Sequence, residues 1–265
     1  MGFSAAWLAL REPADHAARD AGLLAKAAQI VARCPVVVDL GCGTGSTRRA
    51  FGHQIDPATT WRMVDGDPDL LAIAEGEGHC LDLNRVADLP LAGAGLVTAS
   101  ALIDLVSEAW LDALLDRVLA LHLPFYAALS YDGVMEWTPS LPADAQVTEA
   151  FNRHQRGDKG FGLALGPAAT AYAANRLRNA GYAVMVADSA WQLGPAQQDL
   201  QTELLDGIAQ AASEAGFAGD AGGWVQARKA LLGQGFCRIG HQDLLALPRA
   251  TADGRPGSGV QNVSR

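Results

Sequence analysis

The chain has 265 residues, of which 49% are hydrophobic and 18% are charged, and this composition allows one large core or a core with a cap. Its formal net charge of −9 disfavours a nucleic-acid-binding surface, because affinity for nucleic acid depends on Lys and Arg side chains that neutralise phosphates. No apolar stretch approaches the length of a membrane span, so we expect no membrane association and a cytoplasmic protein.

Residues 1–34 are expected to form a helical N-terminal extension. The apolar run at residues 3–10 follows no basic residue, and Arg11 and Glu12 interrupt it too early for a signal peptide. Two interpretations of the extension stay open: a flap over a bound ligand, or a solvated helix face anchored by Trp7. We favour the solvated face.

Residues 36–46 carry the strongest signal in the sequence, because three valines lead into Asp39 and three alternating glycines. The pattern predicts a strand, a ligand-binding loop and a helix start, since glycines adopt positive φ angles and let a ligand lie against main-chain N–H groups. The spacing is G-x-G-x-G rather than the G-x-G-x-x-G of dinucleotide-binding proteins, which disfavours a nicotinamide-dependent dehydrogenase. Asp39, placed just before the first glycine, favours a ligand that carries an ammonium group.

The next segment predicts a second strand that ends in a nucleoside-binding acid. Asp65 closes an apolar strand at residues 61–65, about twenty residues beyond the glycines, where a carboxylate can accept hydrogen bonds from both ribose hydroxyls. A helix over residues 66–74 should follow, because Asp67 is a natural N-cap and Pro68 a natural first helical residue. We therefore interpret Asp67 as a capping residue rather than a ligand contact.

Two further strands are predicted at residues 78–83 and 95–100. Asp82 lies at the end of the first, and Asp88 competes with it for a ligand contact; we favour Asp82, since ligand sites of α/β proteins gather at strand ends. The second of these strands ends in small residues around Ser100, which would let a flat ring or a thioether approach closely.

Residues 39–45, with the sequence DLGCGTG, resemble the first motif of class I S-adenosylmethionine-dependent methyltransferases, and residues 64–74 are similar to the second motif of that family. The resemblance implies that the glycine loop cradles the methionine portion of the cofactor, and that acids after the second and third strands bind the ribose and the adenine amine. In the flap interpretation of the N-terminal extension, Arg11 or Arg19 would reach the methionine carboxylate. The implied cofactor-binding residues are Asp39, Gly41, Cys42, Gly43, Gly45, Asp65, Gly66, Asp82, Leu83 and Ser100.

The resemblance also implies the architecture: a Rossmann-like α/β fold with a seven-stranded, mostly parallel sheet, helices on both faces, and a last strand inserted antiparallel beside the sixth. The sequence pattern itself indicates only alternating helices and strands. We expect this methyltransferase-like domain at residues 35–248, with an inserted cap or lid at 138–166 after the fifth strand and a disordered tail at 249–265. The other predicted elements are strands at 126–131 (extended to 137), 182–188 and 236–247, and helices at 108–118, 143–154, 167–178, 195–215 and 223–232.

Three side chains, Asp104, Tyr131 and His154, are candidates for catalysis at the methyl acceptor. Asp104 is the only ionisable residue in an apolar bend after the fourth strand, where a carboxylate could act as general base or could only order the loop through backbone N–H groups. His154 could take a proton from an acceptor oxygen or nitrogen, although a loop histidine is more often simply exposed. It belongs to the basic stretch at residues 152–160, which we interpret as a substrate-facing loop or cap element.

The sequence thus predicts S-adenosylmethionine-dependent transfer of a methyl group to a small-molecule acceptor, with release of S-adenosylhomocysteine. Because the sulfonium is already activated, positioning supplies most of the catalysis, and a general base matters more for a hydroxyl than for an amine acceptor. The alternative is a methyltransferase-like cofactor-binding protein that acts as a non-catalytic partner or regulatory subunit. The four cysteines form no C-x-x-C pair or Cys/His cluster, so we expect reduced thiols and no metal. The acceptor atom, whether O, N, S or C, and the oligomeric state stay open.

Overall fold

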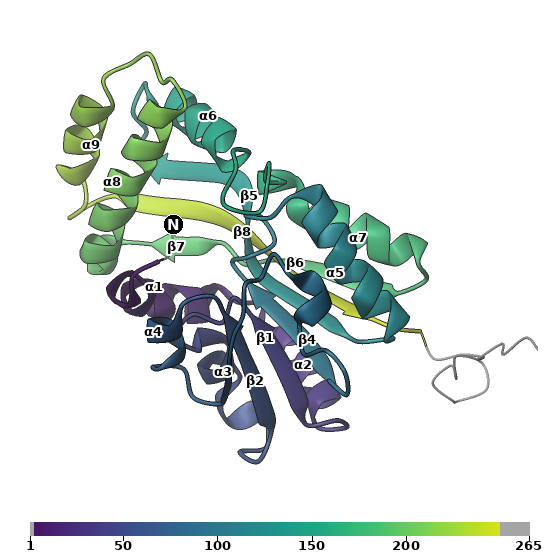
Figure 1. The fold of residues 1–265 in the computed structure, drawn as a ribbon. Coiled ribbons are helices and arrows are strands. Elements are labelled where there is room, and N and C mark those ends of the chain that lie inside the picture. The colour runs from purple at the N-terminus through teal and green to yellow at the C-terminus, as the bar shows by residue number, and fades with distance from the viewer. Residues whose placement is uncertain (1–2, 250–265) are drawn as a thin grey trace, which may run out of the picture.

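A mixed sheet of eight strands forms the centre of the protein (Figure 1). The computed structural model describes residues 3–249, in which the strands follow the order β3-β2-β1-β4-β5-β8-β6, with β7 paired to β8; the predicted tail lies outside them from residue 250 on. The strands are β1 (Val36–Leu40), β2 (Thr60–Asp65), β3 (Glu77–Cys80), β4 (Leu96–Ser100), β5 (Phe125–Thr138), β6 (Ala183–Asp188), β7 (Trp191–Leu193) and β8 (Phe236–Leu247). The α-helices are α1 (Ala5–Ala18), α2 (Ala21–Val31), α3 (Ser46–Phe51), α4 (Pro68–Leu71), α5 (Glu108–Ala120), α6 (Asp144–Gln155), α7 (Ala169–Asn179), α8 (Gln198–Glu214) and α9 (Ala221–Lys229).

The strand order confirms the fold that the resemblance implies. Strands β3, β2, β1, β4 and β5 are parallel neighbours, and β8 lies between β5 and β6, antiparallel to both. The expected number of seven strands was wrong, because the short strand β7 also pairs with β8. β7 has only three residues, too few for a pattern, and it is a strand only because β8 lies beside it.

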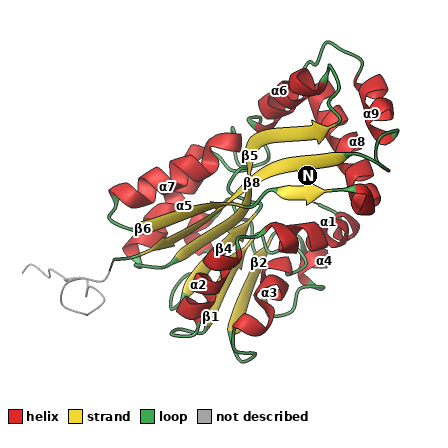
Figure 2. Ribbon diagram, turned by 180° about the vertical axis from the view of Figure 1, so that it is seen from behind, coloured by secondary structure: helices red, strands yellow, loops and turns green. Residues whose placement is uncertain are grey.

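Helices cover both faces of the parallel half of the sheet (Figures 1 and 2). On one face, α5 and α7 pack through fully buried side chains such as Leu114 and Leu177. On the other face, α2 packs through Ala27 and its neighbours, together with Phe51 at the end of α3. Because both faces are buried, β1 and β4 contain almost only buried residues, as expected for parallel strands between two helical layers.

A second lobe extends from the antiparallel side of the sheet (Figures 1 and 2). β5 and β8 are 14 and 12 residues long, and their far ends form this lobe together with β7, α6, α8 and α9. Its core is aromatic and contains Trp137, Trp191 and Trp224. The excursion predicted as a cap, residues 138–166, supplies α6, whereas α8 and α9 come from the chain after β7.

The N-terminal helix α1 does not present a solvated polar face, which corrects the interpretation favoured from the sequence. Arg11, Asp15 and Arg19 are all buried, and Trp7 packs against the core of the second lobe. In Figure 1, α1 lies between the second lobe and the strands of the parallel half. None of the helices in residues 3–249 is long and apolar enough to cross a membrane.

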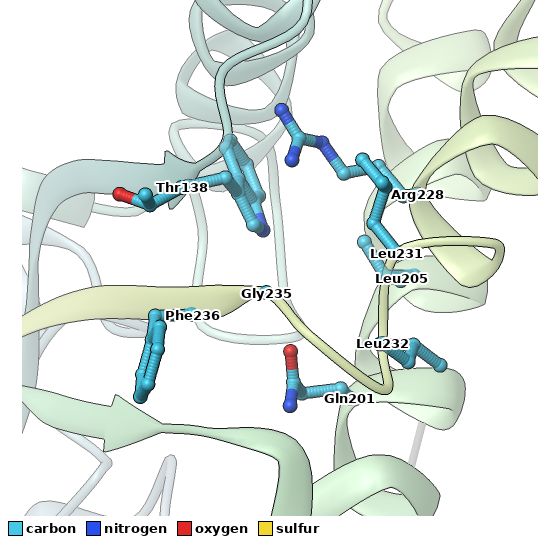
Figure 3. Close-up of a pocket in the computed structure, with 9 residues that line it drawn as sticks. Thr138, Gln201, Leu205, Arg228, Leu231, Leu232, Gly235 and Phe236 are labelled. Atoms are coloured by element: carbon cyan, nitrogen blue, oxygen red, sulfur yellow. The ribbon is translucent and has the colours of Figure 1, made fainter.

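A small cavity in the second lobe lies apart from the candidate site described below (Figure 3). Side chains from the region of α8 and α9, among them Leu205 and Arg228, face Thr138 and Phe236 at the ends of β5 and β8. The cavity has room for about one water molecule. It is therefore a packing defect of the lobe rather than a ligand site.

Candidate active site

The glycine loop between β1 and α3 has the backbone conformation that the sequence predicts. Gly41, Gly43 and Gly45 have φ angles of 61°, 51° and 86°, which favour glycine over residues with a Cβ atom. A Cβ atom added to Gly43 would lie only 2.9 Å from Leu8 Cδ1 of α1. Because Gly43 has no side chain, α1 can approach the loop closely. The buried Cys42 lies between Gly41 and Gly43.

Asp39 is a fully buried carboxylate with one free oxygen. Its Oδ1 accepts a hydrogen bond of 2.7 Å from the hydroxyl of Thr98, whereas its Oδ2 has no partner among residues 3–249. Burial raises the pKa of Asp39 to about 6, and this rise is opposed by the Thr98 hydrogen bond and by the positive charge of Arg19. A buried oxygen without a partner is costly, so this position favours a ligand group that donates a hydrogen bond.

Arg19, at the C-terminal end of α1, is the cationic counterpart of Asp39. Only 6% of this residue is exposed, and its Nη2 donates to Ser100 Oγ at 3.1 Å. Its Nε and Nη1 are buried and have no hydrogen-bond partner among the residues that the structure describes. Ser100 Oγ also lies 3.0 Å from the hydroxyl of Thr47, so the serine at the end of β4 holds the arginine next to the start of α3.

Asp65 connects the end of β2 to the glycine loop. Its Oδ2 accepts a hydrogen bond of 2.8 Å from the backbone N–H of Gly43, and its Oδ1 accepts one of 3.0 Å from that of Asp67. Gly66 follows it as an exposed residue. Asp67 caps α4 by accepting from the backbone of Asp69 and Leu70, which confirms its predicted capping role.

The region after β3 contains the residues considered for adenine. Asp82 is exposed, and its Oδ1 accepts from the backbone N–H of Asn84 at 2.9 Å. Leu83 is buried, and its carbonyl accepts a 2.8 Å hydrogen bond from the indole of Trp110. Asp88, the competitor, forms an ion pair with Arg85 on the surface. An adenine contact by Asp82 or Leu83 stays a prediction.

Helix α1 is attached to the glycine loop by side chains along its length. Glu12 forms an ion pair with Arg49 of α3, with an oxygen–nitrogen distance of 2.6 Å, and this pairing lowers the pKa of Glu12. His16 Nε2 lies 3.1 Å from both the carbonyl and the hydroxyl oxygen of Ser46. With Leu8 on Gly43, these contacts make α1 a cover over the first turn of α3 and the loop before it.

Asp104 and Tyr131 lie close together, as candidates for one site should. Asp104 is 7% exposed, and its Oδ1 has no hydrogen-bond partner in the described part of the chain. Burial raises its pKa to about 6, while its own backbone, Arg11 and the backbone of Tyr131 oppose the rise. The Tyr131 hydroxyl donates a 2.8 Å hydrogen bond to Asn152 Oδ1 of α6, and burial raises the pKa of this tyrosine.

His154, the third candidate, is not brought to this site. Its Nε2 lies 3.0 Å from Glu214 of α8, and its Nδ1 lies 2.9 Å from Lys159 Nζ. Both ring nitrogens therefore have partners that tie α6 to its neighbours in the second lobe. A catalytic role for His154 finds no support in this geometry.

The structure instead places His241 of β8 directly opposite Tyr131 of β5. His241 is 6% exposed, and its Nδ1 has no hydrogen-bond partner within residues 3–249. Burial lowers its pKa to about 3, and the nearby charge of Arg11 adds to this effect. The sequence analysis missed His241 because it lies inside a predicted strand, and only the pairing of β8 with β5 reveals its surroundings.

Asp243, two residues farther along β8, is a second residue that the sequence analysis missed. It is fully buried and accepts hydrogen bonds from the hydroxyl of Tyr126 at 3.0 Å and from the backbone N–H groups of Leu129 and Asp20 at 2.9 and 3.1 Å. Leu129 has a positive φ angle of 56°, which Asp243 helps to hold. Since Asp20 directly follows Arg19, this carboxylate also fixes the backbone next to the buried arginine.

The strand order and the glycine loop together define an α/β protein with the fold of class I methyltransferases. No protein-family model matches the sequence, and no curated protein matches it. Similar solved structures include an O-methyltransferase family protein from Burkholderia thailandensis (18% identity, TM-score 0.41, covering 63% of this chain and 52% of that one). Another is a cyclopropane-fatty-acyl-phospholipid synthase-like protein from Lactobacillus casei (14% identity, TM-score 0.48, covering 89% of this chain and 99% of that one). A third is human N-acetylserotonin methyltransferase in complex with S-adenosylmethionine (16% identity, TM-score 0.42, covering 68% of this chain and 48% of that one).

The chain thus spans about half the length of the Burkholderia and human proteins and almost all of the Lactobacillus protein. At these identities the likeness concerns the fold alone. The function proposed below rests on the residues of the site.

Proposed function

We propose that this protein binds S-adenosylmethionine and transfers its methyl group to a small-molecule acceptor, releasing S-adenosylhomocysteine. The observation that carries the proposal is a pair of buried, oppositely charged groups with unpaired atoms beside the glycine loop. In the part of the chain that the structure describes, one oxygen of Asp39 and two nitrogens of Arg19 have no hydrogen-bond partner. The ammonium and carboxylate groups of an amino acid would satisfy both, because buried charges require partners and hydrogen bonds.

The other residues of the loop fit the same ligand. The backbone of Gly41 to Gly45 can lie against the methionine chain, since no Cβ atom intervenes, and Cys42 forms part of this cradle. Asp65, at the end of β2, is our proposed ribose contact, with Gly66 beside it. Asp82 and Leu83 are our proposed adenine contacts, and Ser100 orients Arg19.

When bound, the cofactor supplies a methyl group already activated by the positive sulfonium. The chain then has two tasks: to hold the amino-acid portion between Asp39 and Arg19, and to present the acceptor in line with the methyl group. α1 lies over the loop through Leu8 and Glu12, which would exclude water from the site. A dinucleotide is disfavoured at this loop, because its phosphates would lie next to the Asp39 carboxylate.

Calorimetry with two ligands tests the proposal. S-adenosylhomocysteine carries the amino-acid group, whereas 5′-methylthioadenosine lacks it and keeps the adenosine. We expect Arg19→Ala to weaken S-adenosylhomocysteine binding about 100-fold, as loss of two charge-assisted hydrogen bonds requires, and to leave methylthioadenosine binding nearly unchanged.

Arg48→Ala is the matched control, because Arg48 lies nearby on α3 but pairs with Glu75 on the surface. It should change neither affinity. The proposal fails if the unaltered protein does not bind S-adenosylhomocysteine, or if Arg19→Ala weakens both ligands equally.

A further inference from the structure

A second set of buried polar atoms without partners lies under α1, and the cofactor proposed above does not use it. The set consists of Oδ1 of Asp104, in the bend after β4, and Nδ1 of His241, in β8. On the basis of the proposed function, we infer that Asp104 and His241 hold the methyl acceptor, a small ring compound that presents an O–H or N–H group to them. This inference names an acceptor class and adds His241 as a catalytic residue.

Arg11 shows that the two groups belong to one cluster. Its positive charge is close enough to lower the pKa of Asp104 and, separately, that of His241. Tyr131 makes the same connection, because its backbone opposes the pKa rise of Asp104 while its side chain lies opposite His241 across the strands. We call Arg11, Asp104, Tyr131, Trp191 and His241 the acceptor cluster.

The charge of Arg11 is already satisfied inside the protein. Its Nε and Nη2 donate to the two oxygens of Asp15 at 2.9 and 3.1 Å, and Trp191 Nε1 donates to the same carboxylate at 2.9 Å. The Arg11 guanidinium also lies over the Trp191 ring, 5.0 Å from its centroid. Arg11 and Asp15 neutralise each other, so the negative charge of Asp104 is not balanced within the cluster. Asp104 would repel an acceptor that carries its own carboxylate, and such an acceptor is therefore disfavoured.

Two aromatic rings flank the imidazole of His241. The centroid of Trp191 lies 5.2 Å from that of His241, and the centroid of Tyr131 lies 6.2 Å from it. Flat apolar walls with a few hydrogen-bonding groups are typical of sites for small ring compounds. The shape of the cluster therefore favours a ring, and its polar atoms determine which atom of the ring compound faces the cofactor.

The hydrogen-bonding chemistry favours an oxygen or nitrogen acceptor over a carbon double bond. An ionised carboxylate can only accept hydrogen bonds, and a neutral imidazole has one accepting nitrogen. An O–H or N–H group satisfies such atoms, whereas an alkene leaves them unpaired at a cost. In the transfer, the acceptor atom bonds to the methyl carbon, the carbon–sulfur bond breaks with its electron pair on sulfur, and the released proton passes to Asp104 or His241.

The test measures binding to the protein saturated with S-adenosylhomocysteine, with 4-ethylphenol, 4-ethylaniline and ethylbenzene as probes. The three probes have nearly the same shape, and only the first two carry a donor hydrogen. We expect the better of the two donors to bind about tenfold more tightly than ethylbenzene. The phenol and aniline arms distinguish an oxygen acceptor from a nitrogen acceptor.

Two variants assign the preference to the cluster. His241→Leu and Asp104→Ala should each reduce the tenfold preference to about threefold or less, with S-adenosylhomocysteine affinity unchanged as the check of folding. His154→Leu is the matched control and should keep the full preference, because this histidine is held by Glu214 and Lys159.

The inference is overturned if the saturated protein binds no probe, binds ethylbenzene as well as the two donors, or keeps its preference in both variants. Failure of the unaltered protein to bind S-adenosylhomocysteine would instead contradict the proposed function. The two failures are therefore distinguishable in one series of measurements.

Discussion

In the parallel half of the sheet, the candidate ligand-binding residues lie at or just beyond the ends of neighbouring strands, whereas on the antiparallel side they lie within two long strands. Asp39 and Asp65 lie at the ends of β1 and β2, so their neighbourhood results from parallel pairing of strands close in sequence. Tyr131 and His241 meet only because β8 inserts beside β5. The first arrangement is encoded locally, and the second depends on the register between distant segments.

Helix α1 joins the two regions, because it contributes a buried arginine to each. Arg19 lies beside Asp39 in the parallel half, and Arg11 lies against Trp191 of the second lobe. The two arginines are eight positions apart in a segment that looked like a solvated helix face. A single N-terminal helix thus completes both the proposed cofactor site and the acceptor cluster.

The largest effect is expected for a substitution of Asp243, which tests whether this residue connects the parallel half to the antiparallel side. Asp243→Ala leaves without an acceptor the buried donors of Tyr126 and Leu129 and the partly buried donor of Asp20. We expect the free energy of unfolding to fall by about 4 kcal/mol, since each buried unsatisfied donor costs about 1–3 kcal/mol and the effects overlap. Urea unfolding measures the change.

Asp188→Ala is the control for Asp243, because Asp188 is an acid of the neighbouring strand β6 whose side chain is largely exposed and pairs with Arg238. It should change stability by no more than about 0.5 kcal/mol. Equal effects of the two substitutions would show that Asp243 does not hold the two regions together.

Much of the parallel half could be predicted from the sequence. The three positive-φ glycines, the cap at Asp67 and the strand ending at Asp65 were all predicted from local patterns. β8 was also predicted with its observed bounds. Local sequence determines these features, since turns, caps and alternation depend on residues close together in the chain.

The remaining features depend on contacts between distant segments. β7 became a strand only by pairing with β8, and the burial of Arg19 required α1 to fold over the glycine loop. His154 was a catalytic candidate because it stands among polar residues, yet its ring nitrogens lie beside Glu214 and Lys159 in the structure. The residue pattern of one segment does not indicate which side chains of a distant segment will contact it.

A smaller effect concerns the pH dependence of the cofactor site. Because the pKa of Asp39 is raised to about 6, the carboxylate is ionised at pH 7 and becomes protonated as the pH falls through 6. The ammonium group of S-adenosylhomocysteine then loses its charged partner, so we expect binding to be roughly tenfold weaker at pH 5 than at pH 7. Calorimetry at the two pH values measures this ratio.

Asp39→Asn separates this effect from other titrations, since the amide oxygen can still accept from Thr98 but carries no charge. Its affinity should be low and nearly independent of pH. Methylthioadenosine, which has no ammonium group, should bind the unaltered protein equally at both pH values. A pH dependence that survives in Asp39→Asn would show that another group controls binding.

The smallest effect concerns the attachment of α1 to the parallel half through Glu12 and Arg49. The folded-state pKa of Glu12 is lowered by this pairing, so the stabilisation is complete above the unfolded pKa of 4.5 and is lost as the pH falls through the folded value. Glu12→Gln should cost about 0.5 kcal/mol at pH 7, because the pair is partly exposed. The difference between the two proteins in urea unfolding should shrink as the pH is lowered from 7 to well below 4.5. Glu149→Gln, which removes an exposed pair with Arg153 on α6, should show no such difference at either pH; a difference of equal size there would mean that α1 is held no more firmly than an ordinary surface helix.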